Sequence, residues 1–268
     1  MAFADNVFMK TSRSRVYAVT SGKGGVGKTF IAVNLSILLS KAGARVLLID
    51  ADMGLANVDL MTGISSQHTI EEIINGNASI FSSLADGPEG LTILPASSGL
   101  GKIQEMGDDS MAVFRKELLK LENAFDLIFI DTGAGISANV VDFVFMADEV
   151  IVIMTPEPTA FADAYAMVKL VSLQKPELKV GVIVNIARNE EDGERIFSKF
   201  SEIVKRFLER PIMYRGTIVR DPAVSEAVIR QVPLALSSGS TPSIQSIRKI
   251  AKNLLGIKSA KKPSLFNR

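Results

Sequence analysis

The sequence contains no cysteine, a single histidine and no long uninterrupted run of apolar residues. Without cysteine, the chain can form neither disulfide bonds nor thiolate zinc sites nor iron–sulfur clusters. One imidazole, His68, with no second soft ligand argues against a transition-metal site. Because there is no stretch of about 18 apolar residues and no basic N-terminus leading into an apolar core, we expect neither a membrane span nor an export signal. We therefore predict a cytoplasmic location.

Acidic residues are missing from the C-terminal part of the chain. From Ala227 to Arg268 there are eight basic residues and no acidic one, and the other 226 residues hold 22 basic against 29 acidic side chains, a net charge of −7. A basic end on an acidic body favours attraction to an anionic surface, although a solvated last helix would show the same composition. The acidic body argues against nucleic acid as a partner.

What the sequence does contain is an alternation of apolar, strand-like runs with helical patterns. The predicted strands cover residues 16–20, 45–50, 91–95, 127–131, 150–155, 180–185 and 217–219. Such alternation is typical of right-handed crossovers and of a sheet covered on both faces. We predict an α/β fold with three α/β/α layers around a mostly parallel twisted sheet. It would form one domain over residues 16–256, between a flexible arm at 1–15 and a basic tail at 257–268.

A glycine-rich loop follows the first predicted strand and directly precedes a helix. The loop Gly22-Lys23-Gly24-Gly25-Val26-Gly27-Lys28-Thr29 matches the phosphate-loop pattern G-x-x-x-x-G-K-[ST]. Glycines let successive N–H groups face phosphate oxygens, and the helix N-terminus adds a partial positive charge for the same anion. We expect Lys28 to reach the β- and γ-phosphates and the Thr29 hydroxyl to ligate Mg²⁺. With Phe30, the next residue, this segment predicts an ATP site in a P-loop NTPase fold.

Two aspartates end apolar strands that would lie near this loop. Asp131 closes the run Leu-Ile-Phe-Ile-Asp, and Asp50 closes Leu-Leu-Ile-Asp. Open α/β sheets bind ligands at the carboxyl ends of their strands, so both carboxylates would lie beside the phosphates. One aspartate at a strand end is more often a turn former. Two of them together with a phosphate loop favour a magnesium site.

The second lysine of the loop needs a task of its own. With Lys23, the segment KGGVGKT resembles the deviant Walker A motif of the MinD/ParA family of ATPases. The resemblance implies that Lys23 crosses to the ATP of a second subunit, so that ATP closes a homodimer. Each ATP would then be contacted by Lys28 of its own chain and by Lys23 of the partner chain, a positive charge supplied in trans. It also implies that Asp50–Asp59 is switch I, in which Asp52 orients the attacking water and Asp50 supports the metal shell.

Further segments carry the same resemblance. The stretch Asp131–Ser137 (DTGAGIS) resembles switch II. The pair Val184-Asn185, with Arg188 shortly after, resembles the adenine pocket of the family, where an asparagine amide reads the edge of the base.

Within the family, the sequences of both predicted switches are most similar to those of the FlhG group, also called FleN or YlxH. The stretches DADMGLANVDLMTGI and DTGAGIS both match that group. The resemblance implies an ATPase switch that regulates the number or placement of flagella and acts on flagellar assembly proteins or a flagellar transcription activator. The first 15 residues lack the D-Q-A-x-x-L-R type segment that many members use to activate the GTPase FlhF, so the resemblance does not extend to activation of FlhF.

Two related functions would use the same chemistry. A ParA-type DNA-partition ATPase would need a basic surface for DNA, and the acidic body argues against it. A MinD-type regulator of the cell-division site is the other alternative. Metallocluster carriers of this family are excluded because the chain has no cysteine.

The last predicted helix is amphipathic. Apolar residues recur at helical spacing over 244–255, with Arg248, Lys249 and Lys252 on the other side. Such a helix can lie on an anionic membrane or pack on its own domain, and we expect packing here. The tail 257–268 is basic with few large apolar groups, and we hypothesise weak, reversible attachment to the inner face of the cell membrane, strengthened in a dimer.

Overall fold

The computed structural model describes residues 13–52, 58–64, 68–96, 108–121 and 123–256. Most of the predicted N-terminal arm, the predicted tail 257–268, and residues 53–57 of the predicted switch I lie outside the described residues.

Eight strands form one sheet in the order β3-β4-β2-β5-β1-β6-β7-β8. They are β1 Arg15–Ser21, β2 Val46–Ala51, β3 Ala85–Asp86, β4 Thr92–Leu94, β5 Leu127–Ala134, β6 Glu149–Met154, β7 Lys179–Ala187 and β8 Met213–Val219. All neighbouring strands are parallel except the pair β3–β4. The predicted mostly parallel sheet is confirmed. The sequence does not predict the antiparallel edge strand β3, because two residues are too few to show an apolar pattern.

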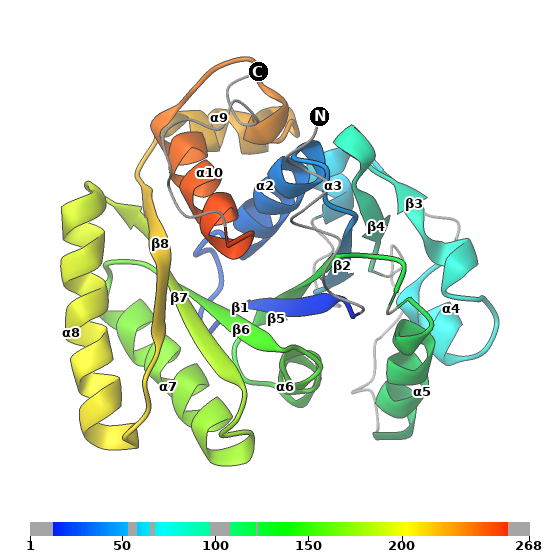
Figure 1. Cartoon of the computed structure of the whole chain (residues 1–268), viewed down its shortest axis with the longest axis horizontal. Helices are drawn as coiled ribbons and strands as arrows, with labels where there is room; N and C mark the ends of the chain where they lie inside the picture. The colour runs from blue at the N-terminus through cyan, green and yellow to red at the C-terminus, as the bar shows by residue number, and fades with distance from the viewer. Residues whose placement is uncertain (1–12, 53–57, 65–67, 97–107, 122, 257–268) are drawn as a thin grey trace.

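Helices cover both faces of this sheet, so the predicted three-layer α/β/α fold is also confirmed (Figure 1). The helices are α2 Lys28–Lys41, α3 Val58–Thr62, α4 Ile70–Ile74, α5 Asp108–Leu119, α6 Ala138–Phe145, α7 Pro158–Gln174, α8 Glu190–Leu208, α9 Pro222–Arg230 and α10 Pro242–Leu254. One face carries α2, α9 and α10, and the other carries α6, α7 and α8.

Alternation along β2 fills a core on each face of the sheet. In β2, Leu48 packs in the cluster that contains α2 and α10, whereas Leu47 and Ile49 pack with α4 and α5. Successive side chains of a strand point to opposite faces, and because both faces are covered, every residue of β2 is buried. This explains why the central strands read as continuous apolar runs.

Helix α2 is buried on all sides, and not only along the apolar stripe that its sequence predicts. It lies between the sheet and α10 (Figure 1). The buried Asn34 has partners for its amide, since Nδ2 donates to the Phe30 carbonyl at 2.8 Å and Oδ1 accepts from the Ala235 N–H at 2.8 Å. Gly43, at a φ of 97°, ends the helix as predicted, and its N–H donates to the Ser40 carbonyl.

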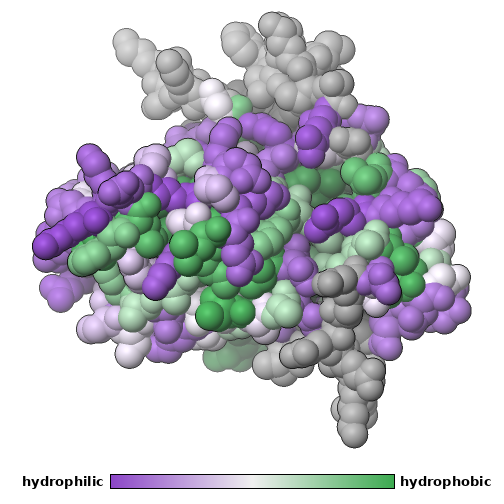
Figure 2. Space-filling view, turned by 90° about the horizontal axis from the view of Figure 1, so that it is seen from below, coloured by the Kyte–Doolittle hydropathy of each residue, from purple (hydrophilic) through white to green (hydrophobic). Residues whose placement is uncertain are grey.

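The C-terminal helix packs on its own domain, as expected. Its buried apolar residues are Ile244, Ile247, Ile250, Ala251, Leu254 and Leu255. On the outer side, Lys249 pairs with Glu190 of α8 at 2.5 Å. No helix in the described part of the chain combines the length and hydrophobicity that crossing a bilayer requires. Apolar side chains do reach the surface over α7 and α8 (Figure 2), among them Leu173 and Phe207.

Asp221 joins the start of α9 to the start of α10. Its Oδ1 accepts from the Ala223 N–H at 3.0 Å, and its Oδ2 accepts from the N–H and the hydroxyl of Ser243 at 3.0 and 2.8 Å. Partial burial raises the pKa of this carboxyl, but the hydrogen bonds together outweigh burial and leave the pKa below its ordinary value. One carboxylate therefore caps one helix and anchors the next.

We predict that Asp221→Ala lowers the free energy of unfolding by about 2 kcal/mol, since a helix cap and charge-assisted hydrogen bonds are lost together. Because the folded-state pKa is lowered, this contribution is present at neutral pH and disappears as the pH falls below about 4. Urea unfolding at pH 7 and at pH 3 measures both effects. Asp86→Ala, at an exposed position, is the control and should change stability by less than about 0.5 kcal/mol. Equal losses in the two variants would contradict this role of Asp221.

Candidate nucleotide-binding site

The glycine-rich loop connects the end of β1 to the start of α2. Gly25 and Gly27 have φ angles of 75° and 91°, the left-handed region that glycine adopts without strain. Two glycines are also required by close packing. A Cβ on Gly27 would lie 2.6 Å from Asn185 Nδ2, and one on Gly22 would lie 2.2 Å from the Asp163 carbonyl oxygen. The loop thus lies directly against the end of β7 and against α7, where no side chain fits.

Hydrogen bonds hold this loop from two sides. The Ser21 hydroxyl donates to the Lys23 carbonyl at 2.6 Å, and Asn185 Nδ2 donates to the Val26 carbonyl at 2.8 Å. Asn185 Oδ1 accepts from the N–H of Ile186 at 2.9 Å, and Ile186 has a φ of 60°, which is strained for a β-branched residue. Asn185, expected from the resemblance to contact the base, is buried here and braces the loop.

Two buried aspartates lie side by side at the carboxyl ends of β2 and β5. Asp50 and Asp131 are register partners, 1% and 0% exposed. Asp50 accepts the N–H groups of Asp52 and Val58, each at 3.1 Å. Neither carboxylate oxygen of Asp131 makes a hydrogen bond of normal geometry with a described residue, although the Thr29 hydroxyl lies near enough to lower its pKa. Two buried oxygens so poorly satisfied are the arrangement that a cation would complete.

Burial controls the pKa values in this cluster. It raises the pKa of Asp50 to about 7. It raises the pKa of Asp131 to about 8, with a further contribution from Asp50, while the hydroxyl of Thr29 and the ammonium of Lys28 act in the opposite direction. Burial also lowers the pKa of Lys28, and the negative charges of Asp131 and Asp52 offset part of that change.

The predicted site residues separate into two groups. Lys28, Thr29, Asp50, Asp52 and Asp131 gather at the carboxyl ends of β1, β2 and β5. Asp52 Oδ1 lies 3.5 Å from the position a Cβ would take on Gly133, so the predicted switches I and II meet there.

The other predicted residues lie elsewhere. The side chain of Phe30 is buried in the hydrophobic core, so only its main-chain N–H belongs to the helix N-terminus. Lys23 points to α7, where Nζ lies 2.8 Å from Glu157 Oε2 and 3.3 Å from Thr159 Oγ1. Sequence reasoning misses Glu157 and Thr159. The available signal was their position directly after the buried strand β6, at the edge of the sheet where the loop lies.

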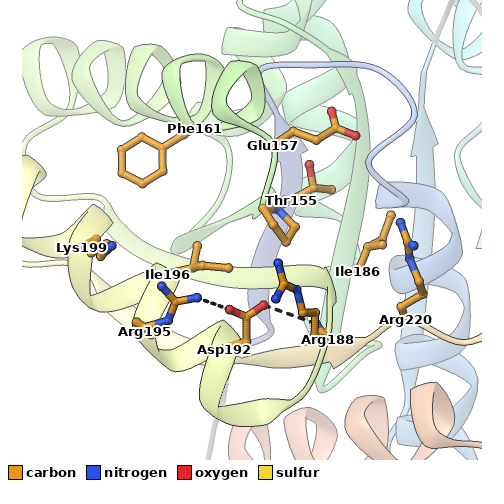
Figure 3. A pocket seen from close by; sticks show the side chains of 11 residues that line it. Thr155, Glu157, Phe161, Ile186, Arg188, Asp192, Arg195, Ile196, Lys199 and Arg220 are labelled. Atoms are coloured by element: carbon orange, nitrogen blue, oxygen red, sulfur yellow. Dashed lines mark hydrogen bonds and ion pairs between the residues drawn. The ribbon is translucent and has the colours of Figure 1, made fainter.

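A cavity of about 520 Å³ opens between the first turns of α7 and α8. Figure 3 shows its lining, which comprises Thr155, Pro156, Glu157, Phe161, Ile186, Arg188, Asp192, Arg195, Ile196, Lys199 and Arg220. Arg195 pairs with Asp192. Arg188, Lys199 and Arg220 form no ion pair with another described residue. The cavity is therefore net basic, and through Glu157 it adjoins the residues that hold Lys23.

A glycine loop between a parallel strand and a helix, with a buried lysine and two strand-end aspartates behind it, defines a P-loop ATPase. The model of an AAA domain (AAA_31) matches residues 14–182. Antiactivator FleN of Pseudomonas aeruginosa is 38% identical over 217 residues, which cover 81% of this chain and 78% of that protein. The chain therefore belongs to the MinD/ParA family of ATPases.

Another relative agrees with this assignment, and two solved structures share the fold. Flagellum site-determining protein YlxH of Helicobacter pylori is 32% identical, and the match covers 91% of this chain and 83% of that protein. A chain of the MinC:MinD cell division complex of Aquifex aeolicus, 28% identical, has a TM-score of 0.75 over 93% of this chain and 99% of its own. MinD of Pyrococcus horikoshii complexed with Mg-ADP is 24% identical and shares the fold with a TM-score of 0.71. The match covers 90% of this chain and 96% of that chain.

The raised pKa of Asp131 predicts how stability depends on pH. The folded chain keeps a proton that the unfolded chain releases near pH 4, so the free energy of unfolding of the nucleotide-free protein falls as the pH rises from about 5 to 8. One such group contributes a slope of up to about 1.4 kcal/mol per pH unit. Asp131→Asn should flatten the slope by that amount, whereas Asp109→Asn, at an exposed position, should leave it unchanged. Urea unfolding at three pH values measures the slopes, and identical slopes would mean that Asp131 is already ionised in the folded chain.

Proposed function

We propose that this protein is an ATP-dependent dimerising switch that regulates the number or placement of flagella. The observation that carries the proposal is the separation of two lysines in one loop. Lys28 is buried beside Asp131 and Asp52, whereas Lys23 is exposed and faces away from them. One lysine is placed for the nucleotide of its own chain, and the other lies at the surface, from which it could reach a second chain. The similarity to FleN and YlxH over most of the chain supports a flagellar role.

The nucleotide would lie on the loop Gly22–Thr29. Its main-chain N–H groups and the N-terminus of α2 suit the phosphates, and Lys28 would contact the β- and γ-phosphates. The poorly satisfied oxygens of Asp131 fit a hydrated Mg²⁺ held with the Thr29 hydroxyl and supported by Asp50. The ion would neutralise the charge that develops on the phosphates. MinD of Pyrococcus horikoshii, which shares this fold, is described as complexed with Mg-ADP.

Asp52 would orient the attacking water. Its backbone is tied to Asp50 through the 3.1 Å hydrogen bond, and its carboxylate meets Gly133 of the second switch. Loss of the γ-phosphate would thus change the contacts of both switch segments, as it does in other nucleotide switches. In this scheme ATP closes the dimer, the dimer recruits its partners, and hydrolysis releases them.

The adenine would lie beyond the braced side of the loop. Asn185 uses one amide hydrogen for the Val26 carbonyl, and its second would donate to the edge of the base. Arg188, exposed at the rim of the basic cavity, would lie beside the nucleotide. The same asparagine would therefore both shape the loop and contact the base.

Partners and location follow from the same proposal. The partners would be flagellar assembly proteins or a flagellar transcription activator, and the name antiactivator for FleN agrees with the second. The chain would act in the cytoplasm, and its basic tail 257–268 would attach reversibly to an anionic membrane surface. A MinD-type role in cell division is the second candidate, supported by the similarity to the MinC:MinD complex of Aquifex aeolicus.

We predict that Asp52→Ala, which stops hydrolysis, accumulates as a dimer with Mg-ATP, and that adding Lys23→Ala weakens this dimer by at least about 100-fold, since two charge-assisted contacts per dimer are lost. Light scattering after size exclusion measures the dimer. Binding of a fluorescent ATP analogue should persist in Lys23→Ala and be lost in Lys28→Ala. A double variant that still dimerises would contradict the role of Lys23 in trans.

The flagellar role predicts a visible phenotype. Deleting the gene in the organism of origin should change the number or position of flagella seen by electron microscopy, and the wild-type gene but not Lys28→Ala should restore it. Normal flagella together with displaced septa or minicells would instead support the cell-division candidate. Normal flagella with unequal plasmid or chromosome inheritance would support DNA partition.

A further inference from the structure

The exposed lysine of the loop is already engaged within its own chain. Lys23 Nζ forms an ion pair with Glu157 at 2.8 Å and a hydrogen bond with the Thr159 hydroxyl at 3.3 Å. Glu157 is the N-cap residue of α7 and Thr159 lies in its first turn. The contact raises the pKa of Lys23, and it lowers the pKa of Glu157. Each group thus stabilises the charged form of the other.

The local structure leaves Glu157 free for this task. An N-cap side chain usually folds back to accept an N–H of the first turn, but that of Glu157 makes no capping hydrogen bond. The carboxylate therefore extends toward the loop and meets Lys23.

The backbone fixes the distance between the two groups. Gly22 packs so closely on α7 that a Cβ there would lie 2.2 Å from the Asp163 carbonyl oxygen. The Ser21 hydroxyl holds the carbonyl of Lys23 itself at 2.6 Å. Loop and helix start therefore form one rigid unit, in which the ammonium of Lys23 can rest on α7 without any rearrangement of the main chain.

We propose that Glu157 and Thr159 form a holding site that keeps Lys23 on its own subunit until the triphosphate of a second subunit draws it away. The inference rests on the proposed crossing of Lys23 in the ATP dimer. The pair is solvent-exposed, with side chains 42% and 63% accessible, and exposed pairs are weak. Glu157 therefore competes with any incoming anion for the Lys23 ammonium. The highly charged triphosphate of a second subunit wins this competition, whereas water or a monoanion does not.

The surroundings of Glu157 allow Lys23 to leave with little loss of free energy. Its side chain lines the basic cavity together with Arg188, Lys199 and Arg220, none of which is ion-paired with another described residue (Figure 3). When Lys23 leaves, the Glu157 carboxylate, 63% accessible, is solvated by water and no buried charge is left without a partner. The holding site can therefore open and close without a large electrostatic penalty.

The test is a double-mutant cycle on the dimer of the full chain. With magnesium and a non-hydrolysable ATP analogue, Glu157→Gln should tighten the dimer by about twofold to thirtyfold, the range for releasing two exposed ion pairs per dimer. In a Lys23→Ala background the same change should have no effect, because it acts only through that lysine. Glu202→Gln, an equal loss of charge at another exposed position, is the matched control. Analytical ultracentrifugation gives the dissociation constants.

Each outcome has a distinct meaning. A dimer that is unchanged or weaker in Glu157→Gln would overturn the holding site, and so would an effect that persists in the Lys23→Ala background. If Lys23→Ala alone leaves the dimer intact, the crossing of Lys23 fails, and the proposed dimer switch fails with it. Thr159→Val provides a second variant and should tighten the dimer by a smaller factor in the same direction.

Discussion

The nucleotide site depends on close packing of the glycine-rich loop against two neighbouring elements. Gly22 touches the backbone of α7, and Gly27 touches the amide of Asn185 at the end of β7. A side chain at either glycine would displace the loop, because the neighbours are backbone or a buried, hydrogen-bonded amide. Through these contacts the loop lies at a set distance from Asp131 and from Glu157. The positions of both lysines follow from that placement.

Electrostatic strain accompanies this geometry. Asp50 and Asp131 are buried next to each other, and burial raises the pKa of both. The cluster is thus poorly satisfied without a cation, and the folded chain loses stability as these groups ionise. A site built to bind a magnesium-bound triphosphate lowers the stability of the nucleotide-free chain, since the same buried carboxylates serve binding and oppose folding.

The two lysines of the loop show how one short segment can serve two subunits. Lys28 starts α2 and turns inward among the strand ends, whereas Lys23 turns outward onto α7. The ion pair with Glu157 places a reversible restraint between the resting chain and its proposed dimer.

Sequence alone determined the fold class, the central strands, the loop and the two strand-end aspartates, because apolar period and the spacing of glycine and lysine are local properties. It also indicated that the last helix is amphipathic, and the structure decided that its apolar side packs on the domain. The tertiary structure decided which side chains meet across the sheet edge. Asn185 braces the loop, the Phe30 side chain enters the core, and Glu157 holds Lys23. These contacts join residues more than 130 positions apart or depend on what covers α2, and no local pattern in the chain encodes them.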